Sequence, residues 1–287
     1  MFYSARELLR LLPMVLRARD FHLYLDNGRR LTDLWLAGGK AVLGHKPPMV
    51  LGELKNAAER GLFAPLPHPI ERRFLKALGE LFPGKVFRLY ADQSFLRRAL
   101  VEAGIPLPDT GFLYDPAFPV GNTDGNTDTG GLSSADGASG KKVSLWRPFM
   151  GSEKEAPVLL PVLPCPLGPE LLVLEKSLDA SFPAGEIIPP VLLAPATRAL
   201  YDLLAALKDK GRAGRVYPKV EKATKSGPWR RRGIYLTIEM DKAKYTLLFK
   251  RFLEGGFLIP PSPVEPIILP AAMSGGEEAK LAELLRD

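Results

Sequence analysis

Hydrophobic and polar residues alternate with two different periods in the first third of the chain. Over residues 4–16 the leucines and Val15 recur every three or four positions, which predicts an amphipathic helix. The next stretch, FHLYLDNGRRLTDLW, alternates with period two around Asp26-Asn27-Gly28. Because Asn-Gly readily adopts the positive φ angles of a two-residue turn, this stretch predicts a β-hairpin.

Helical spacing returns after the hairpin and then gives way to a strand. The patterns predict helices over residues 49–63 and 69–82 and a strand at KVFRLY. Asp92 is placed to cap a helix that continues through Ala103, and Gly104 is placed to end it. This order of helix, strand and helix is typical of an α/β unit.

The second half of the chain repeats this alternation. The runs APVLLPVLPC and ELLVLEK are apolar on both faces, which predicts buried strands of a parallel sheet covered by helices. A helix over residues 195–208 follows, and then a strand at GIYLTIEM, a helix over 241–254, and short strands at FLIP and PIILP. Ser274 with Glu277 three residues later forms a capping box, so a final helix begins there. The predicted fold class is α/β.

Residues 119–142 break the pattern. The core of this segment, GNTDGNTDTGGLSSADGASG, contains one large apolar residue and cannot bury enough surface to offset the entropy of ordering it. We therefore expect a flexible loop. Asp124, Asn126 and Asp128 alternate as in a calcium loop, but the glycine is displaced and the closing glutamate is missing, so a linker is favoured.

Composition narrows the class of protein. The 287 residues are 46 % hydrophobic and 25 % charged, as in a soluble globular protein, and no uninterrupted apolar run is long enough for a membrane span. One cysteine and three scattered histidines give neither a disulfide nor a metal-ligand set. Arginines interrupt the N-terminal leucines, so no secretory signal is expected and the predicted location is cytoplasmic. The net charge of +7 is spread along the chain, which favours solubility over a specific anionic partner.

Three stretches carry a resemblance to a known family. YLDNGRRLTDLWLAGGKAVLGHKPP, with its Gly-His-x-x-Pro turn at residues 44–48, resembles the N-terminal signature of class III aminotransferases and glutamate-1-semialdehyde aminomutases. ELFPGKVFRLYADQS is similar to that family's strand before its phosphate-binding turn. From RRRGIYLTIEM onward, the last third of the chain resembles the family's C-terminal small domain.

The resemblance implies a pyridoxal-phosphate (PLP) enzyme fold of type I, with a small domain built from both chain ends. Expected divisions are an N-terminal arm and part of the small domain at residues 1–45, a reduced large, cofactor-type domain at 46–190, and the C-terminal small domain at 191–287. It also implies a homodimer with its active site at the subunit boundary and, if active, a small amino compound as substrate. The chain is shorter than a full member, and the loss falls near residues 119–142.

The resemblance also implies site residues. In GPELLVLEKSLDASFPAG, Lys176 is the candidate for the Schiff base with PLP, and Pro183 and Gly185 are expected to shape the following turn. Lysine suits this chemistry because its pKa falls when it is desolvated. The alternative interpretation, an exposed lysine at a strand end, stays open. Gln93 and Ser94 fall on the phosphate-binding turn.

The other residues that the family uses at its PLP site are not found at the matching positions. Asp92 stands where a phosphate would bind, and Pro161 and Val162 stand where an acid should face the pyridine nitrogen. A distant carboxylate, such as Asp115 or Glu153, would have to replace that acid. Glu265 stands where an arginine should take the substrate carboxylate.

Three hypotheses about function follow. The first is a residual PLP-binding protein that uses Lys176, and the second is a non-catalytic, dimeric binding scaffold. The third, which ranks well below them, is nucleic-acid binding through residues 229–232, where Trp229 precedes three arginines. Two other clusters are predicted to be structural: His45 in its turn, and residues 146–149, with Trp146 and Arg147, as a loop anchor.

Overall fold

The computed structural model describes residues 4–105, 113–118, 143–150, 156–209 and 217–286. Contacts divide the chain into two units, Met49–Leu204 and the pair of segments Met1–Pro48 and Ala205–Asp287. The divisions therefore fall after Pro48 and within a long helix, whereas the sequence analysis placed them after residues 45 and 190. The predicted flexible segment and its calcium-like pattern lie outside the described residues.

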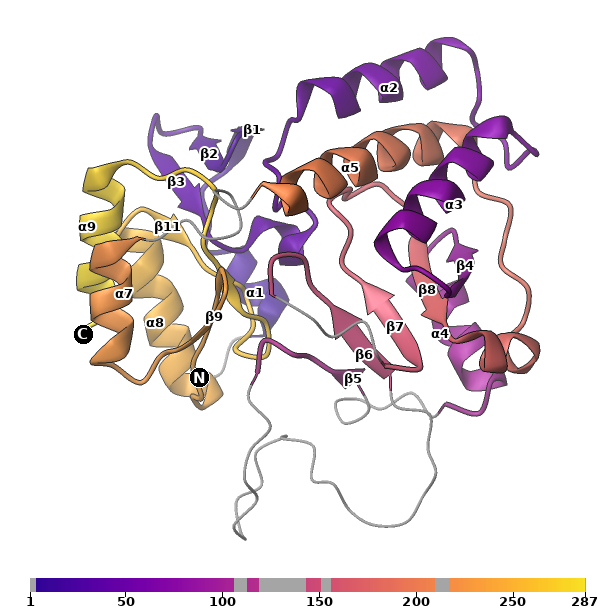
Figure 1. The fold of residues 1–287 in the computed structure, drawn as a ribbon. Coiled ribbons are helices and arrows are strands. Elements are labelled where there is room, and N and C mark those ends of the chain that lie inside the picture. Colours follow the sequence, from indigo (N-terminus) through magenta and orange to yellow (C-terminus); the bar gives the residue numbers. More distant parts are fainter. Residues whose placement is uncertain (1–3, 106–112, 119–142, 151–155, 210–216, 287) are drawn as a thin grey trace, which may run out of the picture. The chain divides into compact units, whose positions relative to one another are not determined.

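The unit Met49–Leu204 contains a five-stranded sheet (Figure 1). Its strand order is β4-β8-β7-β6-β5, and the pairs β5–β6 and β6–β7 are parallel. The bounds are β4 (Val86–Tyr90), β5 (Leu113–Tyr114), β6 (Val143–Trp146), β7 (Val158–Pro161) and β8 (Glu170–Leu174).

Strand β8 runs against both of its neighbours, β4 and β7. The two predicted apolar strands are confirmed, but the expectation of an all-parallel sheet is wrong for β8. The physical reason is the short connection over residues 162–169, because a parallel crossover needs a dozen or more residues. Since β4 and β7 both oppose β8, β4 runs in the same direction as β5, β6 and β7.

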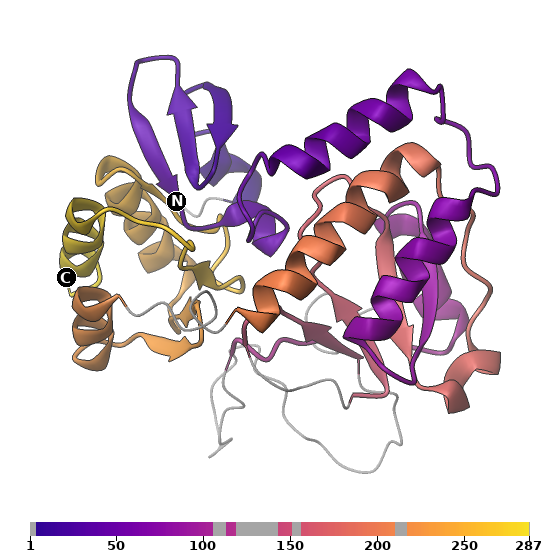
Figure 2. The same cartoon turned by 45° about the horizontal axis from the view of Figure 1, so that its top comes forward.

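Helices cover both faces of this sheet (Figures 1 and 2). Helix α4 (Gln93–Glu102) packs on one face, and α3 (Pro69–Leu81) and α5 (Pro190–Lys208) lie over the other. Helix α2 (Pro48–Glu59) lies beyond α5 and buries only Ala57 completely. By length and composition alone α5 is apolar enough to cross a membrane, but 56 % of its most apolar window is buried, as in a core helix.

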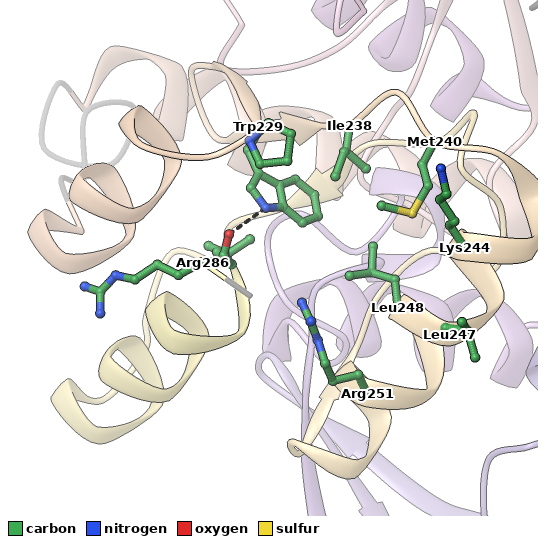
Figure 3. Close-up of a pocket in the computed structure, with 10 residues that line it drawn as sticks. Trp229, Ile238, Met240, Lys244, Leu247, Leu248, Arg251 and Arg286 are labelled. Atoms are coloured by element: carbon green, nitrogen blue, oxygen red, sulfur yellow. Dashed lines mark hydrogen bonds between the residues drawn. The ribbon is translucent and has the colours of Figure 1, made fainter.

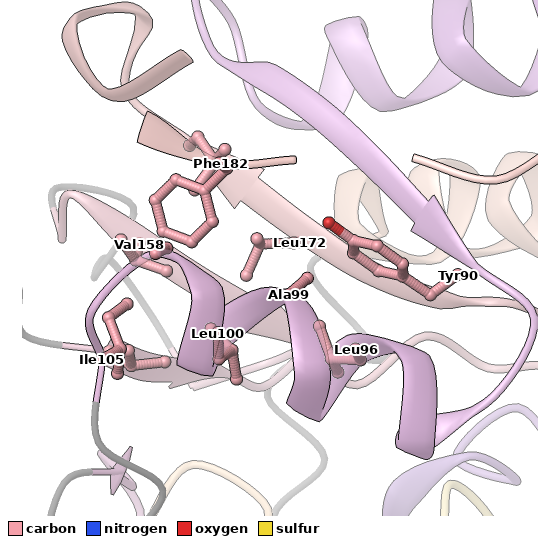
Figure 4. Close-up of a cluster of buried hydrophobic side chains, with 11 residues drawn as sticks. Tyr90, Leu96, Ala99, Leu100, Ile105, Val158, Leu172 and Phe182 are labelled. Carbon is pink, nitrogen blue, oxygen red and sulfur yellow. The ribbon is translucent and has the colours of Figure 1, made fainter. Parts of the chain in front are cut away.

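The core beneath α4 contains one polar atom with no partner (Figure 4). Tyr90, which is 3 % exposed, lies at one end of a buried cluster that also contains Leu96, Leu172 and Phe182. Burial raises the pKa of Tyr90, and its hydroxyl has no hydrogen-bond partner within the described part of the chain. A buried hydroxyl without a partner costs folding free energy.

We predict that Tyr90→Phe raises the free energy of unfolding by about 1 kcal/mol, because it removes an unsatisfied buried hydroxyl and keeps the ring. Urea denaturation followed by circular dichroism measures the change. Tyr245→Phe is the matched control, since the hydroxyl of Tyr245 is equally buried but donates a 2.8 Å hydrogen bond to the carbonyl of Pro260. That variant should be less stable than the wild type. A loss of stability in Tyr90→Phe would contradict the prediction.

The other unit begins with the predicted hairpin. Strands β2 (His22–Leu25) and β3 (Arg30–Asp33) pair in antiparallel fashion, and Gly28 in the turn has φ +76°. The helix predicted over residues 4–16 is only half right, because α1 (Ala5–Leu9) ends before Pro13 and β1 (Val15–Arg19) pairs with β2. Pro13 cannot donate the backbone hydrogen bond that a continuous helix requires.

The C-terminal segment of this unit contains the predicted elements in order, and also a helix, α7, and a strand, β9, that the sequence did not predict. Strand β11 (Phe257–Leu258) joins β3 in parallel, and a second, three-stranded sheet has the order β12-β10-β9. The remaining bounds are α7 (Pro218–Lys225), β9 (Arg230–Arg232), β10 (Tyr235–Thr237), α8 (Lys242–Glu254), β12 (Ile267–Ile268) and α9 (Gly275–Leu284). The predicted capping box of α9 is present.

The carboxylate of Glu277 in α9 joins this helix to the hairpin. Its Oε1 lies 2.8 Å from Nε2 of His22 and accepts hydrogen bonds from Thr32 and Arg30, both at 3.1 Å. Its Oε2 accepts from the backbone N–H of Ser274 at 2.8 Å. Burial by itself raises the pKa of Glu277, but the hydrogen bonds from Ser274, His22 and Thr32 outweigh it and hold the pKa at about 2.

We predict that Glu277→Gln lowers the free energy of unfolding at pH 7 by about 1–2 kcal/mol, since it removes charge-assisted hydrogen bonds. Because the folded-state pKa lies below the unfolded value of about 4.5, this contribution is complete above pH 4.5 and is lost as the pH falls towards 2. Denaturation of both proteins at pH 7 and at pH 3 measures the difference, which should shrink on acidification. A difference independent of pH would contradict the assignment.

Candidate functional site

The carboxyl ends of β4, β5, β6 and β7 lie at the same edge of the sheet, because these four strands run in one direction. In open α/β sheets ligands bind beyond this edge. Polar residues follow three of the strands: Asp92 after β4, Asp115 after β5 and Arg147 after β6. This edge is therefore the place where the fold predicts a ligand site.

In the turn between β4 and α4, a carboxylate of the turn itself binds the backbone N–H groups that begin the helix. Asp92 is the N-cap residue of α4, and its Oδ1 accepts hydrogen bonds from the backbone N–H groups of Ser94 and Phe95, at 2.6 and 3.2 Å. The hydroxyl of Ser94 donates to the same oxygen at 2.5 Å. The hydrogen bonds from Ser94 and Phe95 lower the pKa of Asp92. The cap predicted from the sequence is confirmed.

A second carboxylate reaches the same turn from a distant part of the chain. Oε2 of Glu186 accepts a 2.9 Å hydrogen bond from the backbone N–H of Ala91, and the backbone N–H of Glu186 donates to the carbonyl of Leu89. Two acidic side chains thus take up three backbone donors of this turn, those of Ala91, Ser94 and Phe95, which an anion at the helix N-terminus would otherwise use. The sequence analysis missed Glu186, because nothing in the local pattern places it beside Ala91.

Gln93 and Ser94, the predicted phosphate-binding residues, therefore lie in surroundings that do not fit a phosphate. Both are exposed, but the hydroxyl of Ser94 is engaged with Asp92. A phosphate group at this turn would meet the negative charges of Asp92 and Glu186 at close range. The residues present at this turn satisfy one another instead of presenting an open anion site.

The ends of β5 and β6 are joined by a buried ion pair. Arg147 donates two parallel hydrogen bonds to Asp115, from Nε to Oδ1 at 2.8 Å and from Nη2 to Oδ2 at 2.6 Å. The two side chains are 5 % and 13 % exposed. Such bidentate pairs are strong and geometrically specific, and breaking one partner leaves a buried charge. The sequence offered Asp115 as a substitute for the acid that faces a pyridine nitrogen; here Arg147 binds that carboxylate.

Lys176 lies at the opposite edge of the sheet. The register pairs Tyr90 with Glu170 and Val86 with Leu174, so the end of β8 lies beside the start of β4. At a rise of about 3.3 Å per residue, the length of β4 alone separates the two edges by roughly 13 Å. The structure therefore does not bring Lys176 together with Gln93 and Ser94, and a single site built from all three is ruled out by the strand register.

The surroundings of Lys176 are those of a surface turn. It is exposed and is the first residue of the 3-10 helix η2 (Lys176–Ser181). Arg88 fixes this turn, because its guanidinium contacts the carboxylate of Asp179 and its Nε donates a 3.2 Å hydrogen bond to the carbonyl of Pro183. No desolvated pocket of the kind that activates a lysine surrounds Lys176 among the described residues.

Gly185 has a different role from the predicted one. The segment after η2 runs along the outer edge of β4, and a Cβ at Gly185 would lie 2.9 Å from the backbone N and 3.0 Å from the carbonyl O of Leu89. Glycine is required here by close backbone approach. This approach also delivers Glu186 to Ala91.

The other unit contains two polar pairs that the sequence singled out. Nε2 of His45 lies 2.7 Å from Oδ2 of Asp33, whose other oxygen accepts from the backbone N–H of Leu36, so His45 is structural as predicted. Glu265 accepts a 2.8 Å hydrogen bond from Nε1 of Trp35. The position where the resemblance implied an arginine thus holds an acid bound to an indole.

Trp229 is buried rather than available for stacking. It is 7 % exposed, and its Nε1 donates to the carbonyl of Leu285 at 2.9 Å. The three arginines that follow it form strand β9, and Arg230 lies 3.5 Å from Glu239. The aromatic half of the proposed nucleic-acid motif is therefore part of the core.

This topology is the fold of PLP-dependent aminotransferases, shown by similarity to solved structures. Ornithine δ-aminotransferase of Plasmodium falciparum matches with a TM-score of 0.66 and 11 % identity over 99 % of this chain and 97 % of that one. Acetylornithine aminotransferase from Elizabethkingia anophelis matches at 0.61 and 11 % identity over 99 % and 98 %. Serine palmitoyltransferase from S. paucimobilis, with a bound PLP–myriocin aldimine, matches at 0.62 and 10 % over 96 % and 91 %.

Sequence comparison gives more limited information. No family model matches the chain. An uncharacterized protein of Treponema pallidum (strain Nichols) is 25 % identical over 307 residues, covering 92 % of this chain and 91 % of that protein. An uncharacterized protein of Borreliella burgdorferi (strain ATCC 35210 / DSM 4680 / CIP 102532 / B31) is 35 % identical over 71 residues, which is 25 % of this chain and 26 % of that protein. At these identities the structural neighbours establish the fold alone.

We predict that Gly185→Ala lowers the free energy of unfolding by about 1–3 kcal/mol, because the added Cβ pushes residues 185–186 away from β4. Thermal unfolding at several scan rates measures the effect. Gly79→Ala is the control: Gly79 lies in α3 with nothing within 4 Å of an added Cβ, so alanine there should stabilise the protein. If both glycines tolerate alanine equally, the close approach of Gly185 to Leu89 is not real.

Proposed function

We propose that this chain is a non-catalytic protein with an aminotransferase fold, and that it acts as a binding scaffold rather than as a transaminase. One observation carries the proposal. Two protein carboxylates, Asp92 and Glu186, hold the backbone donors of the turn at the carboxyl end of β4. Repulsion from these acids opposes a phosphorylated cofactor at this turn.

Two further features support the same function. The buried pair of Asp115 and Arg147 engages the carboxylate that follows β5, which the sequence offered as a partner for a pyridine nitrogen. Lys176, the candidate nucleophile, lies at the other edge and is exposed. Nothing among the described residues desolvates it, as the activation of a nucleophilic lysine requires.

Residual PLP binding through Lys176 is the second candidate. The fold supports it, because one of the structural neighbours is described with bound PLP. In this case the cofactor would have to bind at the amino end of the sheet, near η2. Binding there would use Lys176 without Gln93 and Ser94.

A homodimer is the expected assembly, and the α2 segment offers an apolar surface for it. Met49 at the start of α2 and Phe63 and Leu66 just beyond it are 57 %, 61 % and 61 % exposed. Exposed apolar side chains at both ends of α2 are thus available to such an interface. Light scattering of the purified chain gives the molecular mass that decides between monomer and dimer.

The test is an absorbance titration of the purified protein with PLP, followed by borohydride reduction and peptide mass mapping. We expect no discrete Schiff-base band, and pyridoxyl label scattered over surface lysines. Lys176→Ala should then behave like the wild type. Lys76→Ala is the matched control, because Lys76 is exposed on α3 of the same unit.

A visible band with one adduct on Lys176, lost in Lys176→Ala and kept in Lys76→Ala, would refute the scaffold and establish residual PLP binding. The role of the two acids is tested separately with Asp92→Asn combined with Glu186→Gln, which removes both charges and keeps hydrogen-bonding groups. Inorganic phosphate should bind this double variant at least about tenfold more tightly than the wild type. Equal affinity would show that the carboxylates do not exclude anions.

A further inference from the structure

A shallow pocket of about 250 Å³ lies in the unit formed by the two chain ends, apart from the sheet edge discussed above (Figure 3). Its walls come from four segments: the residues before β9, the residues between β10 and α8, helix α8, and the two residues that follow α9. The buried side chains Trp229, Ile238, Leu248 and Leu285 make most of it apolar. A ligand therefore needs an apolar body.

The charged residues around this pocket are all basic. Lys244, Arg251 and Arg286 line it, and it has no acidic lining residue among those described. Lys244 lies at the rim, where its Nζ is 3.4 Å from the carboxylate of Asp241. Figure 3 shows Arg286 extending away from the pocket, whereas the side chain of Arg251 extends from α8 towards Trp229. Arg251 is therefore the cation aimed into the pocket.

The guanidinium of Arg251 has hydrogen-bonding capacity to spare. Its Nη2 donates to the carbonyl of Leu284 at 2.7 Å, which fixes the side chain against the end of α9. Its Nε is buried and has no hydrogen-bond partner within the described residues. An arginine has five N–H donors arranged to bind a carboxylate, and leaving one of them without a partner in a buried position is costly.

We propose that this pocket binds a small amphipathic carboxylate, with its hydrocarbon part against Trp229 and Leu248 and its carboxylate on Arg251. Because the charged residues that line the pocket are basic, we expect a ligand with a negative charge. Because the rest of the lining is apolar, we expect the remainder of the ligand to be a hydrocarbon. A cavity of about 150 Å³ holds one benzene molecule, so 250 Å³ corresponds to a ligand of about ten non-hydrogen atoms. A medium-chain fatty acid such as octanoate has this size. The proposal concerns a site outside the sheet edge and does not depend on whether PLP binds.

The experiment titrates the full chain with octanoate and follows the indole N–H signals of its three tryptophans by NMR. Trp229 donates its N–H to Leu285 in the pocket wall, so its signal, assigned with Trp229→Phe, should shift saturably. Arg251→Gln should weaken binding by about tenfold or more, because it removes a charged hydrogen-bond donor. Arg73→Gln, at an exposed position on α3, removes the same charge elsewhere and should leave the affinity unchanged.

Leu247→Glu provides a second variant that does not disturb the fold, since Leu247 is 69 % exposed at the rim. It places a negative charge at the entrance and should weaken octanoate binding severalfold. Octanol, which has the same chain without the charge, should bind more weakly than octanoate. The proposal is overturned if octanoate produces no saturable shift, if octanol binds as tightly, or if Leu247→Glu binds octanoate like the wild type.

Discussion

The pairing of β8 with β4 and β7 is the constraint that decides which side chains of the unit Met49–Leu204 lie at the same edge of its sheet. A connection of only eight residues forces β8 to run against β7, and the same strand then sets the direction of β4. As a result four strands direct their carboxyl ends to one edge, while the residue after β8, Glu175, and the lysine that follows it emerge at the other. The register of this strand pair is fixed by its backbone hydrogen bonds and by the packing of the apolar side chains of β8 on both faces of the sheet. The separation of Lys176 from Ser94 is therefore as firm as the core itself.

At the carboxyl edge the chain satisfies its polar groups internally. Asp92 and Glu186 accept the backbone donors after β4, and Arg147 neutralises Asp115 between β5 and β6. Each of these arrangements lowers the energy of the folded protein without a ligand, because a buried or clustered polar group is stable only with a partner. The fold is shared with aminotransferases. The proposed loss of activity rests on these internally satisfied groups.

The likeness to aminotransferase structures at about 11 % identity has a simple physical basis. A sheet with helices on both faces requires only that its strands be short apolar runs and that turns fall at the right places. Many sequences meet these requirements, and β8 meets them with leucines and one valine. The residues at the strand ends are not constrained by packing. They can therefore change, as Glu265 beside Trp35 illustrates in the other unit, while the fold persists.

The sequence by itself determined the local elements: the Asn-Gly hairpin, the cap of α4 at Asp92, the capping box of α9, and the order of helices and strands. These features depend on periodicity and on neighbouring residues, so a local pattern is enough to specify them. The prediction from sequence was wrong at Pro13, because the leucine spacing indicated a helix that continues through this proline. It was also wrong about the direction of β8, because that direction depends on the partner strands. Only the tertiary structure placed Glu186 at Ala91, paired Asp115 with Arg147, and put Lys176 at the far edge. Each of these contacts joins residues that are distant in sequence, and only the packing of the whole sheet fixes where they meet.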